Sequence, residues 1–132
     1  MNHLLPDEAR KWLGTPYKHQ GRQIHRGVDC LGLVAEAMKA AGHKVNDRID
    51  YSRYPSGNLL ITGLASQLKE VSLDEIDSGD ILVMAQRTQA NHVMIYDHQS
   101  KTVIHSYFRC GCVVEQPIKL YEGMIKKAFR YE

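Results

Sequence analysis

Residues 26–38 read RGVDCLGLVAEAM, and this stretch places a cysteine between an acidic residue and an apolar run. Apolar side chains recur at helical spacing after the cysteine, which predicts a helix over residues 30–41. Asp29 is a good N-cap for this helix, and Gly42 is a good stop signal. The residues that follow the helical period are Leu31, Val34, Ala35, Met38 and Ala41.

If Asp29 caps this helix, Cys30 lies in its first turn. The positive end of the helix dipole favours a thiolate, which is the reactive form of cysteine. The position is therefore a physically sensible place for a nucleophile. Cysteines are also common in protein cores, so this stretch alone leaves ordinary core packing open.

Beyond this stretch, the patterning changes from helical to strand-like along the chain. Further helices are expected over residues 6–13 and about 57–69. The second half holds short segments rich in β-branched and aromatic residues, separated by polar turns as in an antiparallel meander. The predicted strands are residues 79–85, 92–98, 102–108, 111–116 and 126–132. Helices followed by a meander predict an α+β domain with segregated elements.

Length and composition limit the possible classes. The 132 residues fit a single domain, 1–132, with a modest core. A net charge of +2 is too weak to indicate nucleic acid binding. No apolar run approaches the length of a membrane span, and no secretory signal is visible, so we expect synthesis in the cytoplasm without a signal peptide. Three cysteines are an odd number, which argues against a disulfide framework.

A nucleophilic thiol needs a base, and histidine is the usual one. His92 opens one predicted strand and His105 lies inside the next, and neighbouring antiparallel strands can bring such residues side by side. For either histidine alone, a hydrogen-bonded core residue is the commoner explanation. Together with Cys30 they form a nucleophile, a base and an orienting group. Strand alternation puts His92 on one face with Met94 and Tyr96, and His105 with Val103 and Tyr107.

Five blocks of the sequence resemble the NlpC family of papain-like cysteine peptidases. The blocks are LGTPYKHQGR, VDCLGLV, GDILVM, NHVMIY and VIHSY, and they stand in the family's order at similar spacings. They run from about Ala9 to Tyr107, and the ending KKAFRYE resembles the closing strand of phage members. The resemblance implies a papain-like NlpC-type α+β fold. In that fold, N-terminal helices pack on a small antiparallel sheet or half-barrel.

The same resemblance implies a catalytic role for four residues. Cys30 would be the nucleophile, His92 the general base, and His105 the third polar residue that orients the His92 ring. Tyr17 matches the family tyrosine near the oxyanion site, where its hydroxyl would help the Cys30 backbone N–H hold the developing charge.

The implied substrate is a peptidoglycan stem peptide, typically cut between D-γ-glutamate and a diamino acid, with no cofactor and no metal. Asp29 matches the acid that in relatives helps hold the free amine of the substrate. His19 follows the tyrosine block, and we expect it to border the substrate-binding cleft.

Two departures separate this sequence from most bacterial wall enzymes of the family. Leu31 follows the cysteine where those enzymes have a serine, and KHQGR replaces the commoner Gly-Gly after the tyrosine block. Both features resemble the phage cell-wall peptidase branch, including tail-associated forms. We therefore expect delivery to the cell wall in a virion, with phage tail proteins as candidate partners.

Three other hypotheses remain open. Cys110 and Cys112, with His98 and His105 upstream, are a weak zinc candidate because zinc sites usually space their cysteines more widely. The chain could be a virion assembly or effector protein with secondary or no peptidase activity. The same Cys-His chemistry also serves acyl transfer.

Overall fold

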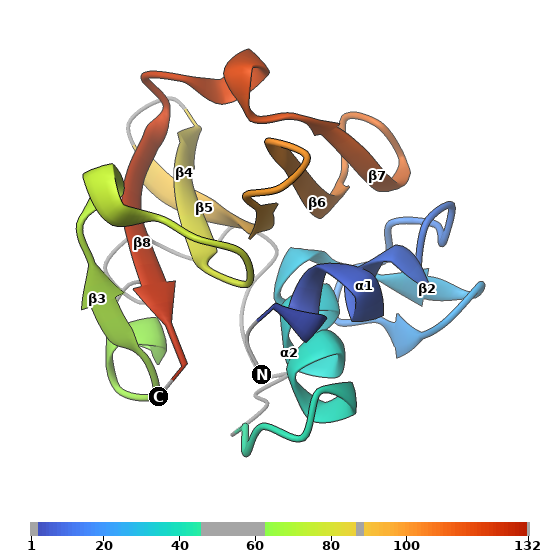
Figure 1. Cartoon of the computed structure of the whole chain (residues 1–132). Coiled ribbons are helices and arrows are strands. Elements are labelled where there is room, and N and C mark those ends of the chain that lie inside the picture. The colour runs from blue at the N-terminus through green and yellow to red at the C-terminus, as the bar shows by residue number, and fades with distance from the viewer. Residues whose placement is uncertain (1–2, 46–62, 87–88, 132) are drawn as a thin grey trace.

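The computed structural model describes residues 3–45, 63–86 and 89–131 of the chain. Two helices precede most of the strands, which confirms the predicted α+β class (Figure 1). The elements are α1 (Leu4–Arg10), β1 (Arg22–Gln23), β2 (Gly27–Val28), α2 (Cys30–Ala40), β3 (Lys69–Val71), β4 (Ile81–Gln86), β5 (Gln89–Asp97), β6 (Thr102–Tyr107), β7 (Cys112–Pro117) and β8 (Ile125–Arg130), with 3-10 turns at Leu73–Glu75 and Ile118–Tyr121.

Helix α2 begins and ends where its capping residues predict. Asp29 has extended backbone, and its side chain accepts a hydrogen bond from the Gly32 N–H at 2.8 Å. At the other end Gly42 adopts a φ of 89°, and the His43 N–H donates to the Met38 carbonyl at 2.9 Å. This is the Schellman arrangement, in which a left-handed glycine ends the helix.

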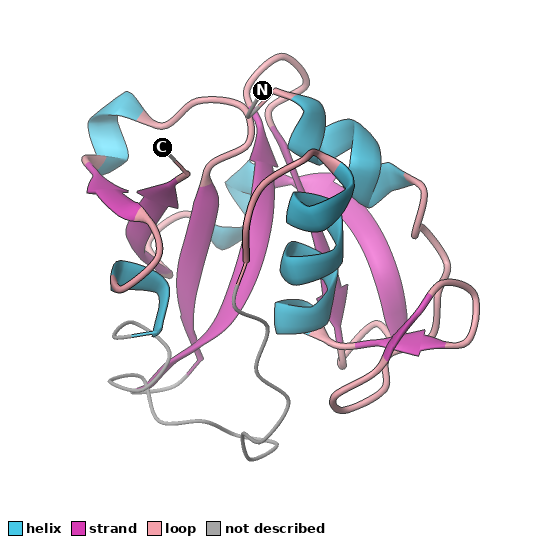
Figure 2. Cartoon of the chain, turned by 90° about the horizontal axis from the view of Figure 1, so that it is seen from below, coloured by secondary structure: helices cyan, strands magenta, loops and turns pink. Residues whose placement is uncertain are grey.

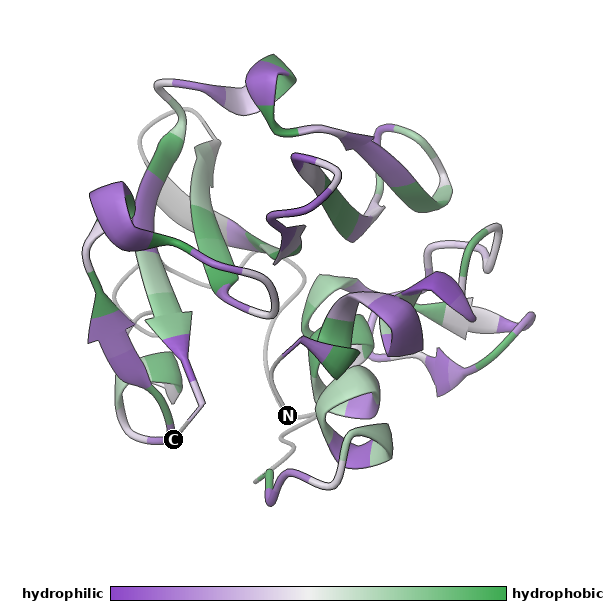
Figure 3. Ribbon diagram, viewed as in Figure 1, coloured by the Kyte–Doolittle hydropathy of each residue, from purple (hydrophilic) through white to green (hydrophobic). Residues whose placement is uncertain are grey.

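The main sheet has the strand order β3-β8-β4-β5-β6-β7, and all neighbours are antiparallel. Helix α2 lies against this sheet and contacts β5 and β6 (Figure 2). Alternate residues of the strands feed two apolar clusters, one shared with the helices and one on the opposite face. Hydrophobic colouring accordingly concentrates on the central strands and on α2, while the Leu73–Glu75 turn is mostly hydrophilic (Figure 3).

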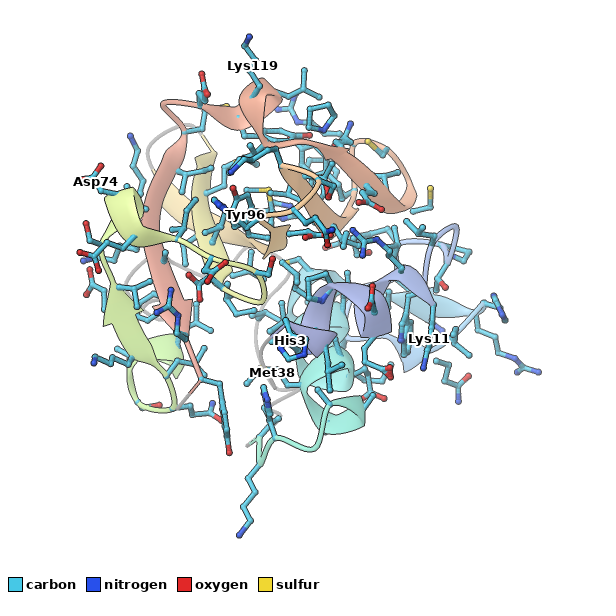
Figure 4. All side chains as sticks on the ribbon, viewed as in Figure 1. His3, Lys11, Met38, Asp74, Tyr96 and Lys119 are labelled. Carbon is cyan, nitrogen blue, oxygen red and sulfur yellow. The ribbon has the colours of Figure 1, made fainter. Side chains whose placement is uncertain are left out.

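The second cluster lies on the face of the sheet away from α2. Its members include Met94, Tyr96, Val103 and Tyr107, the residues that strand alternation assigned to the faces of His92 and His105. Tyr96 lies among side chains at the centre of the molecule, whereas Lys119 and Asp74 project from its periphery (Figure 4). The predicted alternation of β5 and β6 is therefore confirmed.

The meander is confirmed for β4 to β7, but the last strand leaves it. Strand β8 does not pair with β7; it pairs with β4 on one side and β3 on the other. The segment between β7 and β8 runs along the top of the molecule in Figure 1 and includes the 3-10 turn Ile118–Tyr121. Sequence periodicity cannot distinguish these pairings, because alternation is the same at every position in a sheet.

The sequence prediction also differs from the structure in several local bounds. The first helix is Leu4–Arg10 rather than 6–13, and the short strands β1, β2 and β3 were not predicted. Most of the predicted helix 57–69 lies outside the described residues. Its described end is helical at residues 63–65, and strand β3 begins at Lys69.

Arg10 links helix α1 to the edge strand β7 of the sheet. Its guanidinium donates to the two carboxylate oxygens of Glu115 at 3.0 and 2.9 Å, and also to Asp97. Glu115 lies on β7 and Asp97 ends β5, so one side chain joins three elements. These contacts hold the pKa values of both carboxyl groups below their usual range.

Candidate active site

The loop before α2 is organised around the Asp29 carboxylate, which is buried. Besides the Gly32 N–H, the carboxylate accepts the Gln20 N–H at 2.7 Å and Arg22 Nη1 at 3.1 Å. His19 Nδ1 lies 3.9 Å from the same group. The structure therefore brings Asp29 and His19 together, with Arg22 as an internal cation beside them.

Cys30 is the first residue of α2 and is partly exposed. Its sulfur accepts a backbone hydrogen bond from Val93 on β5, besides those from the first turn of its own helix. Because Val93 directly follows His92, this contact places the Cys30 sulfur beside the middle of β5, next to His92 in the chain. Helix α2 and strand β5 thus place the predicted nucleophile against the residue that follows the predicted base.

The protonation of Cys30 differs from the sequence-based expectation. Burial, and after it the nearby Asp29 carboxylate, raise the pKa of the Cys30 thiol to about 12. The prediction that Cys30 is a thiolate is therefore wrong for the protein without substrate, in which the thiol keeps its proton at neutral pH. The residue that caps the helix supplies a negative charge next to the thiol, and this charge opposes the helix dipole.

His92 and His105 are in direct contact. His92 Nε2 lies 2.7 Å from His105 Nδ1, and both residues are buried. Burial, together with the neighbouring His105, lowers the pKa of His92 well below its usual value. Burial also lowers the pKa of His105 to about 4. Both rings are consequently neutral at neutral pH, so each carries one N–H and one lone pair.

Aromatic rings enclose the histidine pair. Tyr107 lies 4.9 Å from the His92 ring and 5.0 Å from the His105 ring, centroid to centroid. Tyr121 approaches His105 edge-on at 5.4 Å. This packing restricts rotation of the imidazoles and excludes water from their far side.

Tyr17 lies in the loop that precedes β1. Its backbone bridges to Val28, two residues before Cys30, and its N–H donates to the Gly111 carbonyl at 2.8 Å. The Tyr17 ring meets Phe108 edge-on at 6.3 Å. The turn between β6 and β7 therefore supports the loop that carries Tyr17.

Several residues around the site were not singled out by sequence reasoning. Gln116 Oε1 lies 2.8 Å from His105 Nε2 and also accepts the Tyr121 hydroxyl at 2.6 Å. The Ser106 hydroxyl donates to the Val28 carbonyl at 2.6 Å and ties β6 to the segment before Cys30. For Gln116 the sequence offers one signal, which is strand alternation. Gln116 lies two residues beyond Val114, the residue that pairs with His105, and therefore shares its face.

Cys110 and Cys112 are both free thiols. Cys110 is exposed in the turn and Cys112 begins β7, with the Cys112 sulfur 3.8 Å from the Cys110 carbonyl. Within residues 3–45, 63–86 and 89–131, no three His, Cys, Asp or Glu residues are grouped to hold a metal ion. In the same ranges, no helix combines the length and apolar character of a membrane span.

The fold resembles several solved structures. An NlpC/P60 family protein from Bacillus cereus ATCC 10987 matches with a TM-score of 0.76 at 22% identity, covering 99% of this chain and 40% of that one. A lipoprotein-like NLP/P60 family protein from Staphylococcus aureus matches at 0.72 and 20% identity, covering 98% and 41%. This chain thus spans about two fifths of those two proteins.

Two isolated domains match along nearly their whole length. The NlpC/p60 domain of the peptidoglycan hydrolase SagA has a TM-score of 0.72 at 19% identity, covering 98% of this chain and 97% of that one. RipD from Mycobacterium tuberculosis, described as a non-catalytic NlpC/p60 domain protein adapted to peptidoglycan binding, has a TM-score of 0.66 at 16% identity, with coverages of 98% and 95%. At these identities, the likeness establishes the fold.

No curated protein matches the chain significantly. The sequence profile of the NlpC/P60 family, however, matches residues 14–129, a range that contains Tyr17, Cys30, His92 and His105. Members of this family are generally cysteine peptidases or hydrolases. With the fold and the sequence profile in agreement, the chain belongs to the NlpC/P60 family.

Proposed function

We propose that this chain is a cysteine hydrolase that cleaves an amide bond in peptidoglycan stem peptides, between D-γ-glutamate and a diamino acid. Cys30 is the nucleophile, His92 the general base and His105 the residue that orients His92. The observation that carries the proposal is the 2.7 Å contact between His92 Nε2 and His105 Nδ1. It leaves His92 Nδ1 as the nitrogen available to Cys30.

In acylation, the Cys30 thiol gives its proton to His92 Nδ1 as the sulfur attacks the substrate carbonyl. The raised pKa of the thiol supports proton transfer during the attack rather than a preformed ion pair. The oxyanion is held by the Cys30 backbone N–H at the start of α2 and by the Tyr17 hydroxyl. The tetrahedral species collapses, the C–N bond breaks, and the leaving amine takes the proton from His92.

In deacylation, His92 removes a proton from water, and the resulting hydroxide attacks the thioester formed with Cys30. The C–S bond breaks, the peptide leaves as a carboxylic acid, and His92 returns the proton to the Cys30 sulfur. Neutral His92 is the form that both half-reactions need, and the lowered pKa of His92 supplies it at neutral pH.

Asp29 and His19 are proposed to face the amino end of the substrate. The Asp29 carboxylate is buried and already contacts Arg22, so a substrate amine would have to share that carboxylate with an internal cation. Comparing stem peptides with a free and with an acylated amino terminus tests this role. A marked preference for the free amine supports it, and equal rates would contradict it.

The central experiment incubates the protein with stem peptides of defined sequence and identifies the products by mass spectrometry. Cleavage at one amide bond, lost in Cys30→Ala and in His92→Ala, is expected. Cys110→Ala is the matched control, because Cys110 is an exposed thiol outside the proposed machinery. Cleavage that persists in Cys30→Ala would contradict the assignment of the nucleophile.

A second candidate function is peptidoglycan binding without cleavage. It is favoured by the likeness to RipD, which is described as non-catalytic, and by the raised pKa of Cys30. Sedimentation of the wild-type protein with purified peptidoglycan, without release of soluble peptides, would support this alternative. The contact of Cys30 with Val93 and the contact of His92 with His105 support hydrolysis.

We also propose that the chain reaches the cell wall as part of a phage tail, on the basis of the sequence features around Leu31. Mass spectrometry of purified particles from the parent phage or prophage tests this. Detection of the chain in the particles supports the proposal, and its absence would refute it.

A further inference from the structure

A continuous line of side-chain contacts extends from His92 on β5, through His105 on β6, to Gln116 on the edge strand β7. His92 Nε2 contacts His105 Nδ1 at 2.7 Å, and His105 Nε2 contacts Gln116 Oε1 at 2.8 Å. The Tyr121 hydroxyl donates to the same oxygen of Gln116 at 2.6 Å. The line therefore ends in an amide oxygen that faces a ring nitrogen of His105 and the hydroxyl of Tyr121.

Sheet register explains why these side chains meet. His105 pairs with Val114 and Val103 pairs with Gln116 across β6 and β7, so Gln116 is the diagonal neighbour of His105 on one face. Tyr121 follows in the 3-10 turn after β7, where it is buried against His105. Both partners of Gln116 are thus held by packing.

An amide oxygen carries no proton and can only accept hydrogen bonds. Because Gln116 Oε1 faces His105 Nε2, that nitrogen must carry the N–H. In a neutral ring, Nδ1 of His105 then holds the lone pair, and it accepts the N–H of His92 Nε2. In neutral His92, this leaves the lone pair on Nδ1, the nitrogen available to Cys30.

Rotation of the Gln116 side-chain amide, which exchanges its oxygen and its NH₂ group, would reverse the direction of each hydrogen bond from Gln116 to His92. If the NH₂ group of Gln116 faced His105, it would require a lone pair on His105 Nε2. His105 Nδ1 would then donate to His92 Nε2, and His92 Nδ1 would carry the proton. Such a ring cannot accept a proton from Cys30. Such a rotation would break the hydrogen bond that the Tyr121 hydroxyl donates to the amide oxygen.

We propose that Gln116, held by Tyr121, is a positioning residue that sets the tautomers of His105 and His92 and so makes His92 a base toward Cys30. The effect of Gln116 on rate rests on the proposed hydrolase function. The tautomers themselves do not, and they can be measured without any substrate.

The first test is nitrogen NMR of protein labelled with ¹⁵N-histidine, which distinguishes Nδ1–H from Nε2–H tautomers. In the wild type, His92 and His105 are both expected to carry Nε2–H. In Gln116→Met, which has no amide oxygen, we expect a mixture of tautomers at both rings. Unchanged tautomers in a folded Gln116→Met protein would overturn the proposal, whatever the protein's activity.

The second test uses rates of stem-peptide cleavage. Gln116→Met is expected to lower kcat on the order of 10²-fold with little change in KM, because only proton transfer is impaired. Gln99→Met is the matched control, since Gln99 is exposed in the turn after β5, and it should keep the wild-type rate. An equal loss in both variants, or a loss confined to KM, would overturn a positioning role.

A third variant guards against simple misfolding of Gln116→Met. Gln116→Glu keeps an acceptor toward His105 but adds a negative charge, which favours protonated His105. Since protonated His105 donates from Nδ1, activity should be kept at high pH and the acidic limb of the rate profile should move to higher pH. An unshifted limb would contradict the proposal.

Tyr121→Phe separates the hydroxyl from the ring. It should lower kcat in the wild-type background and have no further effect in Gln116→Met, because Tyr121 acts through Gln116. Independent, additive losses would show that Tyr121 does not act through this amide. If the wild type cleaves nothing, the NMR outcome alone decides the proposal.

Discussion

Two opposing effects act on the thiol of Cys30, and their sizes decide its charge. A helix N-terminus stabilises a nearby negative charge by about 0.3–1 kcal/mol, which is less than one pKa unit. Burial shifts the pKa of a thiol in the opposite direction, by up to about 3–5 units when burial is complete. Burial therefore prevails, with help from the Asp29 carboxylate, and the pKa of Cys30 lies near 12.

The raised pKa of Cys30 predicts how the rate of its alkylation depends on pH. In a Cys110→Ser, Cys112→Ser background, the rate of Cys30 with iodoacetamide should rise about tenfold per pH unit from pH 6 to 9, because only the thiolate reacts. Mass spectrometry of the quenched protein gives the rate. A plateau below pH 7 would instead indicate a thiolate–imidazolium ion pair.

At the scale of elements, the start of α2 is packed closely against the loop before it. A Cβ atom at Gly32 would lie 2.6 Å from the Gly21 carbonyl oxygen and 2.6 Å from Arg22 Nη1. Gly32 lies inside a helix, where alanine is intrinsically favoured over glycine by about 1 kcal/mol. The contact with backbone outweighs this preference, because the Gly21 carbonyl cannot move without the loop.

Gly32→Ala is accordingly expected to lower the free energy of unfolding by about 1–3 kcal/mol, as overpacking does. Urea denaturation followed by circular dichroism measures it. Gly63→Ala is the matched control, since a Cβ there meets nothing within 4 Å, and it should be neutral or stabilising. A stabilised Gly32→Ala protein would show that the loop accommodates the methyl group.

The end of β8 is joined to the start of β4 by a buried carboxylate. Asp80 accepts Arg130 Nε at 2.8 Å and Nη2 at 2.9 Å, and also the Asp77 N–H at 2.8 Å. Asp80 is fully buried, so the loss of its charge leaves the Arg130 guanidinium without its counter-ion. The GD pair before β4 thus has a structural role.

For Asp80→Asn we expect the free energy of unfolding to fall by about 1–3 kcal/mol, because the buried carboxylate loses its charge-assisted hydrogen bonds to the partly exposed Arg130. Glu70→Gln provides the control, because Glu70 on β3 also pairs with a cation of β8. Glu70 pairs with Lys127 at 3.0 Å at the exposed surface, so its loss should cost less than about 0.5 kcal/mol. Equal effects in the two variants, read from urea denaturation, would contradict this ranking.

At the scale of the whole molecule, two buried neutral histidines make stability depend on pH. The unfolded chain protonates both rings near pH 6.5, whereas the folded chain keeps them neutral well below that pH. Between pH 6.5 and the lowered pKa of about 4 for His105, the unfolded state therefore binds more protons, and acidification favours unfolding.

The free energy of unfolding should fall by about 1.4 kcal/mol per pH unit for each of His92 and His105 below pH 6, and these two rings should contribute nothing above pH 7. Urea denaturation at a series of pH values measures the slope. His105→Gln should reduce it, while His25→Asn, at an exposed left-handed position, should not. An unchanged slope in His105→Gln would show that His105 is not the group that titrates.

Local features explain how much of the fold and of the candidate site the sequence predicted. The N-cap Asp29, the helical period after Cys30 and the alternation around His92 and His105 act over a few residues, so they can be read directly. The short strands β1 to β3 have too few residues to show a period. The pairing of β8 with β4 and β3 depends on contacts between segments far apart in the chain.

The sequence alone therefore determined the helix that carries Cys30, the strands that carry the two histidines, and the NlpC family resemblance. Tertiary structure decided two properties of the site. It set the protonation of Cys30, because burial arises only when α2 packs against β5. It also selected Gln116 as the partner of His105, because the register between β6 and β7 determines which side chains meet across the sheet.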